Sequence, residues 1–409
     1  MKTTRPRNII GLQIGDIVTS SAVKPITSGF LVADNSVYLQ SAYPKLFNIL
    51  GIPNYSPNTL MDTPVDIPPS APLGSGISGD GTYYGIASGA TPFVTIYKNV
   101  ANKYEKLANP AALPPGSSTG CSFSSDGVYL TVTSSAPDYI TNYQRAGDVY
   151  TKLTAPASLP AGAASGSAYS DDGAYMAVSC ASPPYIKIYS NVAGTYTALA
   201  DPAVVPPGAA SHVAFSGDGN YLTVLYGSPP YLTTYKLTAG NYVALATPLS
   251  VPPGAPSGLS YNYDGSILAI SHGTVPYMTL YNKTGDVFTQ VDNPVDMPVS
   301  ATADVSVSSN SSVLCLTYAS PPYINFYRNA NGNFLKIARL SVPPVGAPTN
   351  MSMSLDSAVV ALTFAPSPYV SSYVSIAPFD TATEFAVPDA LLVDSPDSPI
   401  TLINYIRAK

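Results

Sequence analysis

The feature that most constrains this chain is an internal repeat with a period of 46 residues. An aromatic residue that closely follows a proline recurs seven times at this interval, and a tyrosine four positions further on keeps the same interval in every copy. The first series is Phe93, Tyr139, Tyr185, Tyr231, Tyr277, Tyr323 and Tyr369, and the second is Tyr97, Tyr143, Tyr189, Tyr235, Tyr281, Tyr327 and Tyr373. Such unbroken spacing predicts one structural unit that is repeated seven times.

One copy, residues 117–162, predicts four short strands. Its first half, SSTGCSFSSDGVYLTVTSS, contains two runs rich in β-forming residues on either side of Asp126-Gly127, a pair that tolerates positive φ in a tight turn. Its second half contains DYITNYQ, in which side chains alternate, then a polar turn and VYTKLTAP. The Asp-Gly pair recurs in five copies and weakens to Asn310-Ser311 and Asp356-Ser357. No copy carries an apolar stripe at helical spacing, and the prolines would break a helix.

Seven four-stranded units with this period predict an all-β fold, a seven-bladed β-propeller. An open β-solenoid is the alternative, but its coils are usually shorter and its ends need caps, whereas a closed ring leaves only short, protected edges. Ring closure commonly borrows one strand from the opposite end of the array. Asn58–Pro64 and Thr383–Pro388 are both candidates for that strand, and the sequence does not choose between them. We assign residues 58–376 to the propeller and 377–409 to a C-terminal extension, for ring closure or contact with a neighbouring chain.

Composition and charge exclude several classes of protein. Only 10% of the residues are charged and 45% are hydrophobic, so the chain has enough apolar surface for a large core. The net charge is −6 and there is no basic run, which makes nucleic acid a poor candidate partner. Cys121, Cys180 and Cys315 are too few and too scattered for a disulfide framework. No usual export signal opens the chain and no apolar stretch reaches the roughly 18 residues that span a bilayer, so we expect no membrane insertion.

The loops of a four-stranded meander predict two different faces on the propeller. The loop between units and the loop between the second and third strands emerge on the same side, and their sequences, such as LPPGSS, VPPGAA and SPPY, are rich in proline and nearly uncharged. Such stiff loops lose little entropy when a partner binds, and tyrosines offer apolar area with a hydroxyl group. The first aromatic series is therefore a candidate interaction face. Packing between units is the more common role for a tyrosine at a fixed position.

Individual sites are expected where one copy departs from the repeat. His212 and His272 are the only histidines, and Asp138 replaces a proline of the SPPY loop in the second copy, but drift explains such changes more often than a ligand does. No carboxylate pair, no Ser, His and Asp order and no Gly-rich loop before a helix indicates catalysis or cofactor binding. The Asp-Gly turns lack the ligand spacing of calcium loops, and two histidines are too few for a His-rich metal site. We expect a protein that is not an enzyme and that has no cofactor and no metal, although scattered carboxylates of the kind used by some propeller glycosidases are not excluded.

Residues 1–57 lie outside the repeat and predict a small α+β domain. Two β-like runs, in GDIVTSS and SGFLVADNSVYLQ, precede a short amphipathic helix at Ser41–Leu50, with Leu46 and Ile49 on its apolar face. Ser41 is a suitable helix cap and Gly51 a suitable stop.

This arrangement resembles the tail collar domain of tailed bacteriophages. The similar segments are Gly15-Asp16-Ile17-Val18, Gly29-Phe30-Leu31, Asp34-Asn35-Ser36 and the run from Tyr43 to Gly51, YPKLFNILG. Phe30 stands where the collar pattern has tryptophan, and Asn35 stands where it has glycine. The 46-residue repeat is likewise similar to WD40-like propeller repeats attached to such collar segments in phage virion proteins. The resemblance implies that residues 1–57 anchor the chain to other virion proteins, and the anchoring residues it points to are Phe30, Leu31, Tyr43, Leu46 and Phe47.

The function implied by the resemblance is that of a structural virion protein, located in the tail, baseplate or fibre region and oligomeric in the virion. Its propeller would be displayed for adhesion to a glycan or protein of the host surface. One alternative is a capsid, collar or tail decoration or joining protein whose propeller contacts only other virion subunits. A less favoured alternative is a depolymerase that cleaves surface polysaccharide.

Overall fold

The computed structural model describes residues 59–374, apart from residues 295, 331, 338, 339 and 341, together with five short strands outside this range. The chain divides into two compact units, of which Thr59–Val374 form one, and Met1–Asn58 with Ser375–Lys409 form the other. The strands of the second unit are β1 (Ile17–Ser20), β2 (Phe30–Val32), β3 (Val37–Leu39), β32 (Glu384–Ala386) and β33 (Ile403–Arg407).

Strands from both ends of the sequence pair in this second unit. β33 pairs antiparallel with β1 and with β2, and β32 pairs antiparallel with β3. The C-terminal extension therefore contributes strands to sheets that it shares with the N-terminal segment. The helix expected at Ser41–Leu50 lies outside the described residues.

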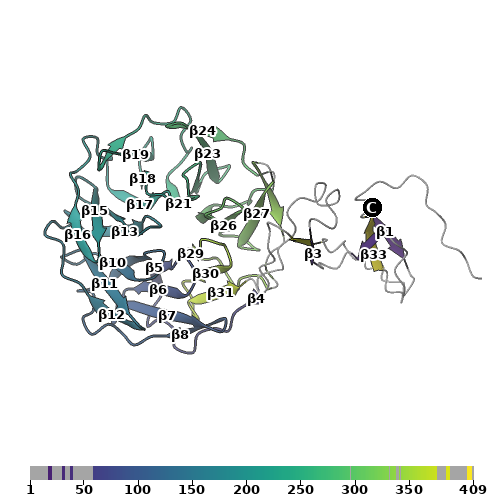
Figure 1. Ribbon diagram of the computed structural model, residues 1–409, viewed down its shortest axis with the longest axis horizontal. Coiled ribbons are helices and arrows are strands. Elements are labelled where there is room, and N and C mark those ends of the chain that lie inside the picture. Colours follow the sequence, from purple (N-terminus) through teal and green to yellow (C-terminus); the bar gives the residue numbers. More distant parts are fainter. Residues whose placement is uncertain are drawn as a thin grey trace, which may run out of the picture. The chain divides into compact units, whose positions relative to one another are not determined.

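Residues 59–374 form seven four-stranded antiparallel sheets in a ring, which confirms the predicted propeller (Figure 1). The first strands, which surround the central axis, are β5 (Pro72–Ile77), β9 (Ser118–Phe123), β13 (Ala164–Tyr169), β17 (Ala210–Phe215), β21 (Pro256–Tyr261), β25 (Thr302–Val307) and β29 (Asn350–Met353). The second strands are β6 (Tyr83–Ser88), β10 (Tyr129–Ser134), β14 (Tyr175–Cys180), β18 (Tyr221–Tyr226), β22 (Ile267–His272), β26 (Val313–Tyr318) and β30 (Val359–Thr363). The third strands are β7 (Val94–Val100), β11 (Ile140–Ala146), β15 (Ile186–Val192), β19 (Leu232–Thr238), β23 (Met278–Thr284), β27 (Ile324–Ala330) and β31 (Val370–Val374). The outer strands are β8 (Lys103–Lys106), β12 (Val149–Lys152), β16 (Thr195–Ala198), β20 (Asn241–Ala244), β24 (Val287–Val291), β28 (Asn333–Ile337) and, in the seventh blade, β4 (Thr59–Leu60).

The ring is closed by a strand that precedes the first repeat. β4 pairs antiparallel with β31, with Leu60 opposite Tyr373. The N–H of Met61 then donates to the carbonyl of Ser372 at 2.8 Å, and the Met61 side chain is buried in the cluster between blades 7 and 1. Of the two segments left open by the sequence, the N-terminal one therefore completes the seventh blade, whereas β32, from the other segment, pairs with β3.

The meander order gives the ring two faces. We call the turn face the one that carries the turns after each first strand and each third strand, and the proline face the one that carries the mid-blade turns, between second and third strands, and the inter-blade segments. β31 runs toward the turn face and β4 runs away from it, with Thr59 opposite Val374. Both ends of the propeller's chain therefore leave the ring on the turn face.

Backbone hydrogen bonds between blades surround the turn-face end of the channel. The N–H of Gly79 donates to the carbonyl of Ser125 at 2.8 Å, and the N–H of Tyr263 donates to the carbonyl of Ser309 at 3.0 Å. Ser309 donates in turn to Leu355 at 2.9 Å, and Leu355 donates to Gly79 at 2.8 Å. The last of these bonds crosses from blade 7 to blade 1, so the closure repeats the contacts made elsewhere in the ring.

The Asp-Gly pair forms the first turn of five blades through local hydrogen bonds, and Asn310-Ser311 and Asp356-Ser357 form this turn in the other two. In blade 3, the N–H of Gly173 donates to the carbonyl of Ser170 at 2.8 Å. The carboxylate of Asp172 accepts the Ser170 hydroxyl at 2.6 Å and the N–H of Ala174 at 3.0 Å. Gly173 has a φ of 68°, which glycine adopts without steric cost, and Ser311 has a φ of 64° in the equivalent position of blade 6.

Tyrosines of the second aromatic series bind inter-blade segments to the following blade in five blades, whereas the buried hydroxyl of Tyr235 has no partner among the described residues. All seven of these tyrosines are buried, with at most 1% of each side chain exposed. The hydroxyl of Tyr189 donates to the carbonyl of Ser158, 31 residues earlier, at 2.9 Å. Tyr143 and Tyr281 make the equivalent bond. Because a buried hydroxyl needs a partner, this bond satisfies the tyrosine and holds the inter-blade segment in place.

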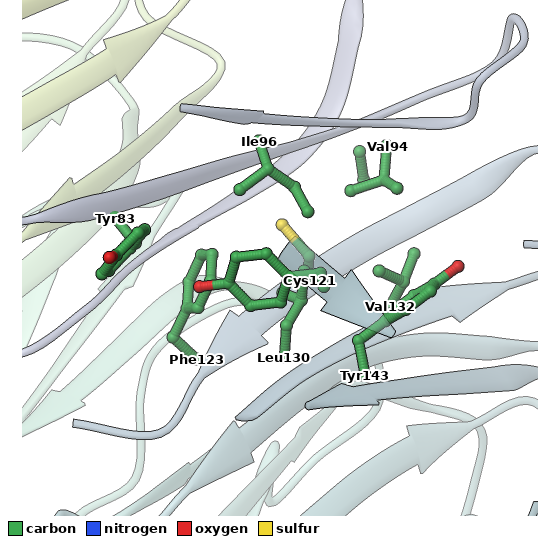
Figure 2. Packing of buried hydrophobic residues seen from close by; sticks show 10 residues of the cluster. Tyr83, Val94, Ile96, Cys121, Phe123, Leu130, Val132 and Tyr143 are labelled. Atoms are coloured by element: carbon green, nitrogen blue, oxygen red, sulfur yellow. The ribbon is translucent and has the colours of Figure 1, made fainter. Parts of the chain in front are cut away.

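Apolar side chains of neighbouring blades pack against each other and form the core. Figure 2 shows the cluster between blades 1 and 2, in which Val94 and Ile96 of β7 lie near Cys121 of β9 and Leu130 and Val132 of β10. All three cysteines of the chain are buried and form no disulfide. Each blade therefore has its apolar surface covered by its neighbours, and no blade has a separate core.

Replacing Met61 by alanine is expected to lower the free energy of unfolding by about 2–4 kcal/mol, because it leaves a cavity where the ring closes. Val65 is 83% exposed, so Val65→Ala is a matched control and should change the value by less than about 0.5 kcal/mol. Denaturant unfolding followed by circular dichroism measures both. Equal effects of the two substitutions would contradict the role given to Met61.

Gly173→Ala is expected to destabilise the propeller by about 1 kcal/mol, because alanine disfavours positive φ. The added Cβ would lie 3.5 Å from Ser124, an ordinary contact, so the cost is conformational. Gly227 lies in the mid-blade turn of blade 4, outside the positive-φ region and with no atom near its missing Cβ. Gly227→Ala should therefore leave the melting temperature unchanged or raise it slightly. The explanation fails if both variants melt at the same lowered temperature.

Candidate functional site

Two kinds of loop lie in contact on the proline face. The N–H of Ala181, at the start of the mid-blade turn of blade 3, donates to the carbonyl of Ala163 in the inter-blade segment at 2.9 Å. A Cβ added to Gly162 of that segment would approach the hydroxyl oxygen of Ser182 too closely to fit. The two loops therefore share one face, in agreement with the prediction.

The mid-blade turn holds the aromatic residue of the first series in an unusual backbone conformation. In blade 3, the N–H of Tyr185 donates to the carbonyl of Ser182 at 2.8 Å, and the carbonyl of Tyr185 accepts the N–H of Cys180 at 2.9 Å. The Pro183–Pro184 peptide bond is cis. All seven members of the series have φ between 56° and 73°. Residues with a bulky side chain rarely adopt this conformation, so the bonds on both sides of each aromatic hold it there.

The first series is half-buried in all seven blades, in contrast to the second. Tyr139 and Tyr185 pack against the clusters at blade interfaces, and part of each side chain still meets solvent. Aliphatic side chains of the inter-blade segments are also exposed: Val65 is 83% exposed, and Leu249 is fully exposed. The seven aromatics thus lie half-buried on one face, and at least Tyr139 and Tyr185 also pack against the core.

Two of the residues that depart from the repeat have local structural roles. His272 is buried, its Nδ1 donates to the carbonyl of Thr274 at 2.8 Å, and its Nε2 accepts the Thr279 hydroxyl at 3.0 Å. Burial lowers the pKa of His272, which keeps the ring neutral. Asp138 is exposed in the mid-blade turn of blade 2 and has a φ of 69°. Neither arrangement brings another ionisable side chain into contact with these residues among those described.

The residues assigned to the anchor lie in the smaller unit. Phe30 and Leu31 belong to β2, which pairs with β33. Tyr43, Leu46 and Phe47 lie outside the described residues.

Charged pairs between blades lie on the turn face. Lys98 of blade 1 contacts Asp148 of blade 2 at 2.8 Å, and Lys236 of blade 4 contacts Asp286 of blade 5 at 2.7 Å. These pairs are solvent-exposed, so each adds little stability. They make the turn face ionic. The proline face carries the pair of Lys187 with Asp201 at 2.9 Å, but loops rich in proline, small residues and aromatics dominate it.

The first strands enclose a central cavity of about 350 Å³ that the sequence did not indicate as a site. Asp304 of β25 lines this cavity, and its carboxylate accepts the N–H of Met351 of blade 7 at 3.1 Å. Burial raises the pKa of Asp304 to about 7. His212 of β17 lines the same cavity, and burial lowers its pKa.

A second half-buried carboxylate lies at the turn-face end of the channel. Asp171 lies over Gly217 of the next blade, and its pKa is raised to about 6 by burial and by the neighbouring Asp172 and Asp218. Neither carboxylate is conspicuous in the sequence, where the histidines and Asp138 are the clearer departures from the repeat. Comparing the copies position by position finds Asp304, because four other blades have glycine there.

The described residues include no group of three or more His, Cys, Asp or Glu side chains arranged to hold a metal ion. They also include no helix long and apolar enough to cross a membrane.

Comparisons with known proteins bear on the fold. A scan against models of protein families gives no match, and a search of curated proteins gives none. Among solved structures, hydrazine synthase of Kuenenia stuttgartiensis is similar, with a TM-score of 0.59 and 14% identity, over 76% of this chain and 97% of that one. At this identity the likeness shows the fold alone. Because that protein is named as an enzyme, the likeness does not support the expectation that this chain is not one, and no comparison supports a phage origin or a collar domain.

Asp304 is expected to make the propeller less stable as the pH rises. Its pKa is about 7 in the folded protein against 3.8 as the reference value, so between these values the folded state binds more protons than the unfolded state. Stability from this group therefore falls from about pH 4 to pH 7, and Asp304→Asn removes that loss. Melting temperatures at pH 5 and pH 8 should show the variant gaining several degrees on the native protein at pH 8.

The native protein and the Asp304→Asn variant share all other groups whose titration changes the stability. Asp171, with a raised pKa, also lowers the stability as the pH rises. His212 and His272, with lowered pKa values, raise the stability as the pH rises. Only the difference between variant and native protein is therefore informative. A difference that does not change with pH would show that Asp304 is ionised at its ordinary pKa.

Proposed function

We propose that the chain is a structural protein of a tailed-phage virion, anchored by its smaller unit, with a propeller that adheres to the host surface through its proline face. The resemblance of residues 15–51 to the tail collar pattern, and of the repeat to propellers attached to such segments, supports the virion assignment. Two residues of that pattern, Phe30 and Leu31, lie in β2 of the smaller unit.

The observation that carries the adhesive role is the ring of half-buried aromatics on the proline face. Seven equivalent residues, each held by the same two backbone bonds and at φ between 56° and 73°, present rigid apolar surface around one face. Rigid aromatic groups contribute binding energy at a low entropic cost, which favours them at interfaces.

The position of the chain ends also supports this role. Thr59 and Val374 leave the ring on the turn face, so connections to the smaller unit begin on the side opposite the aromatics. The ionic turn face, with pairs such as Lys98 with Asp148, suits a solvated surface.

Substituting Tyr185, Tyr231 and Tyr277 together by alanine in the full-length chain is expected to reduce binding to host cells at least tenfold, because it removes adjacent aromatic contacts. Tyr263 is 53% exposed at the turn-face end of the channel, so Tyr263→Ala is a matched control that should bind like the native protein. Flow cytometry with labelled protein measures binding, and melting temperatures verify folding.

The same experiment separates the alternative functions. Native protein that fails to bind host cells but binds particles lacking it would favour a decoration or joining protein and overturn the adhesive role. Release of reducing sugar from host polysaccharide would favour a depolymerase. Equal binding by the triple variant and the native protein would remove the proline face from the interaction.

A further inference from the structure

One position of the first strand, equivalent in all seven blades, carries different residues in different blades. Four of the seven equivalent positions are glycine, and the other three carry polar side chains. All seven line the cavity of about 350 Å³, and they are Gly74, Gly120, Gly166, His212, Gly258, Asp304 and Asn350. Because glycine has no side chain, neighbouring first strands approach closely at this position, and a Cβ added to Gly74 would lie only 2.7 Å from the Cα of Gly120.

The carboxylate of Asp304 lies along the channel wall without a cationic partner. One oxygen accepts the N–H of Val305 at 2.8 Å, and the other accepts the N–H of Met351 at 3.1 Å. A Cβ added to Gly258 would collide with the first oxygen, so the carboxylate occupies space that this glycine leaves free. The described residues that line the cavity include no lysine or arginine. A half-buried carboxylate without a positive charge nearby is stabilised by a cation that enters the cavity.

His212 lines the same cavity and has one ring nitrogen without a partner in the part of the chain that the structure describes. Its Nδ1 is inaccessible to solvent and has no hydrogen-bond partner among the described residues. Both ring nitrogens of His272, the other histidine, are bonded. Because burial lowers the pKa of His212, the ring is neutral near pH 7, and a neutral imidazole has one nitrogen free to accept a proton donor.

We propose that His212, Asp304 and Asn350 form a channel site that binds a small organic ammonium ion. Its N–H groups match the carboxylate, the imidazole nitrogen and the amide oxygen, and its charge neutralises Asp304. An anion would meet the carboxylate with no compensating cation. The described residues hold no cluster of metal ligands, which sets a metal ion aside. Neutral alcohols meet the same acceptors without neutralising the charge, so they are the proper comparison.

Ethanolamine and ethylene glycol are matched probes, because they differ in replacing an ammonium group by a hydroxyl. The full-length protein is labelled with ¹⁵N-histidine, which gives two ring systems, and each probe is titrated at pH 7.5. The His212 signals should shift and saturate with ethanolamine at concentrations in the millimolar range, as expected for so small a ligand. The His272 signals should stay in place. Ethylene glycol should cause no saturable shift.

Asp304→Asn keeps the shape of the side chain and removes its charge, and it should weaken ethanolamine binding at least tenfold. Asp138→Asn removes the same charge from an exposed turn and should leave binding unchanged. Unshifted His272 signals show that each variant is folded. If Asp304→Asn does not fold, two measurements on the native protein still test the proposal. They are the comparison of ethanolamine with ethylene glycol and the pH dependence of ethanolamine binding.

Binding should also weaken more than tenfold between pH 7.5 and pH 5.5, because Asp304, with a pKa of about 7, becomes protonated over this range. The other titratable side chains that line the cavity are His212 and Cys121; the pKa of the histidine is lowered, and that of the thiol is raised to about 12. No saturable His212 shift with ethanolamine, an equal shift with ethylene glycol, or an affinity unchanged in Asp304→Asn would each overturn the proposal.

Discussion

Contact between neighbouring blades is the interaction on which the whole propeller depends. A four-stranded sheet has two apolar faces and cannot cover either by itself, so clusters such as the one containing Val94 and Leu130 exist only where two blades meet. The hydrogen bond from Leu355 to Gly79 and the burial of Met61 show that the seam between the last and first blades is built like the other six. Every blade is therefore stabilised on both sides, which a linear array does not achieve at its ends.

This arrangement leaves the loops free to differ in chemistry between the faces. The turns that use Asp172 and its equivalents are satisfied by local hydrogen bonds and project polar groups. The loops on the other face are held by the buried tyrosines of the second series and by bonds such as that from Ala181 to Ala163. Because these tyrosines and hydrogen bonds hold the loops in place, apolar side chains such as that of Leu249 stay exposed and do not pack onto the core. The same framework encloses a channel whose lining varies from blade to blade.

The repeat was enough to predict the number of blades, the four strands in each and the position of the turns, because each copy confirms the others. β4 was ambiguous, since two paired residues carry too little pattern to be recognised against a competing segment. The two aromatic series also read alike, but Tyr185 has positive φ and stays half-buried, whereas Tyr189 lies within a strand and is covered. Asp304 was overlooked because an isolated acidic residue carries no signal until the glycines at the same position are aligned with it.

The seam strand has a mechanical consequence. Thr59 and Val374 are paired residues on adjacent strands, so both linkers begin at the same corner of one blade. Tension applied to both linkers in the same direction passes into that corner without pulling the circle open. Tension that separates the linkers loads the β4–β31 pair one hydrogen bond at a time, which makes this short strand the point at which the ring is expected to fail first under force.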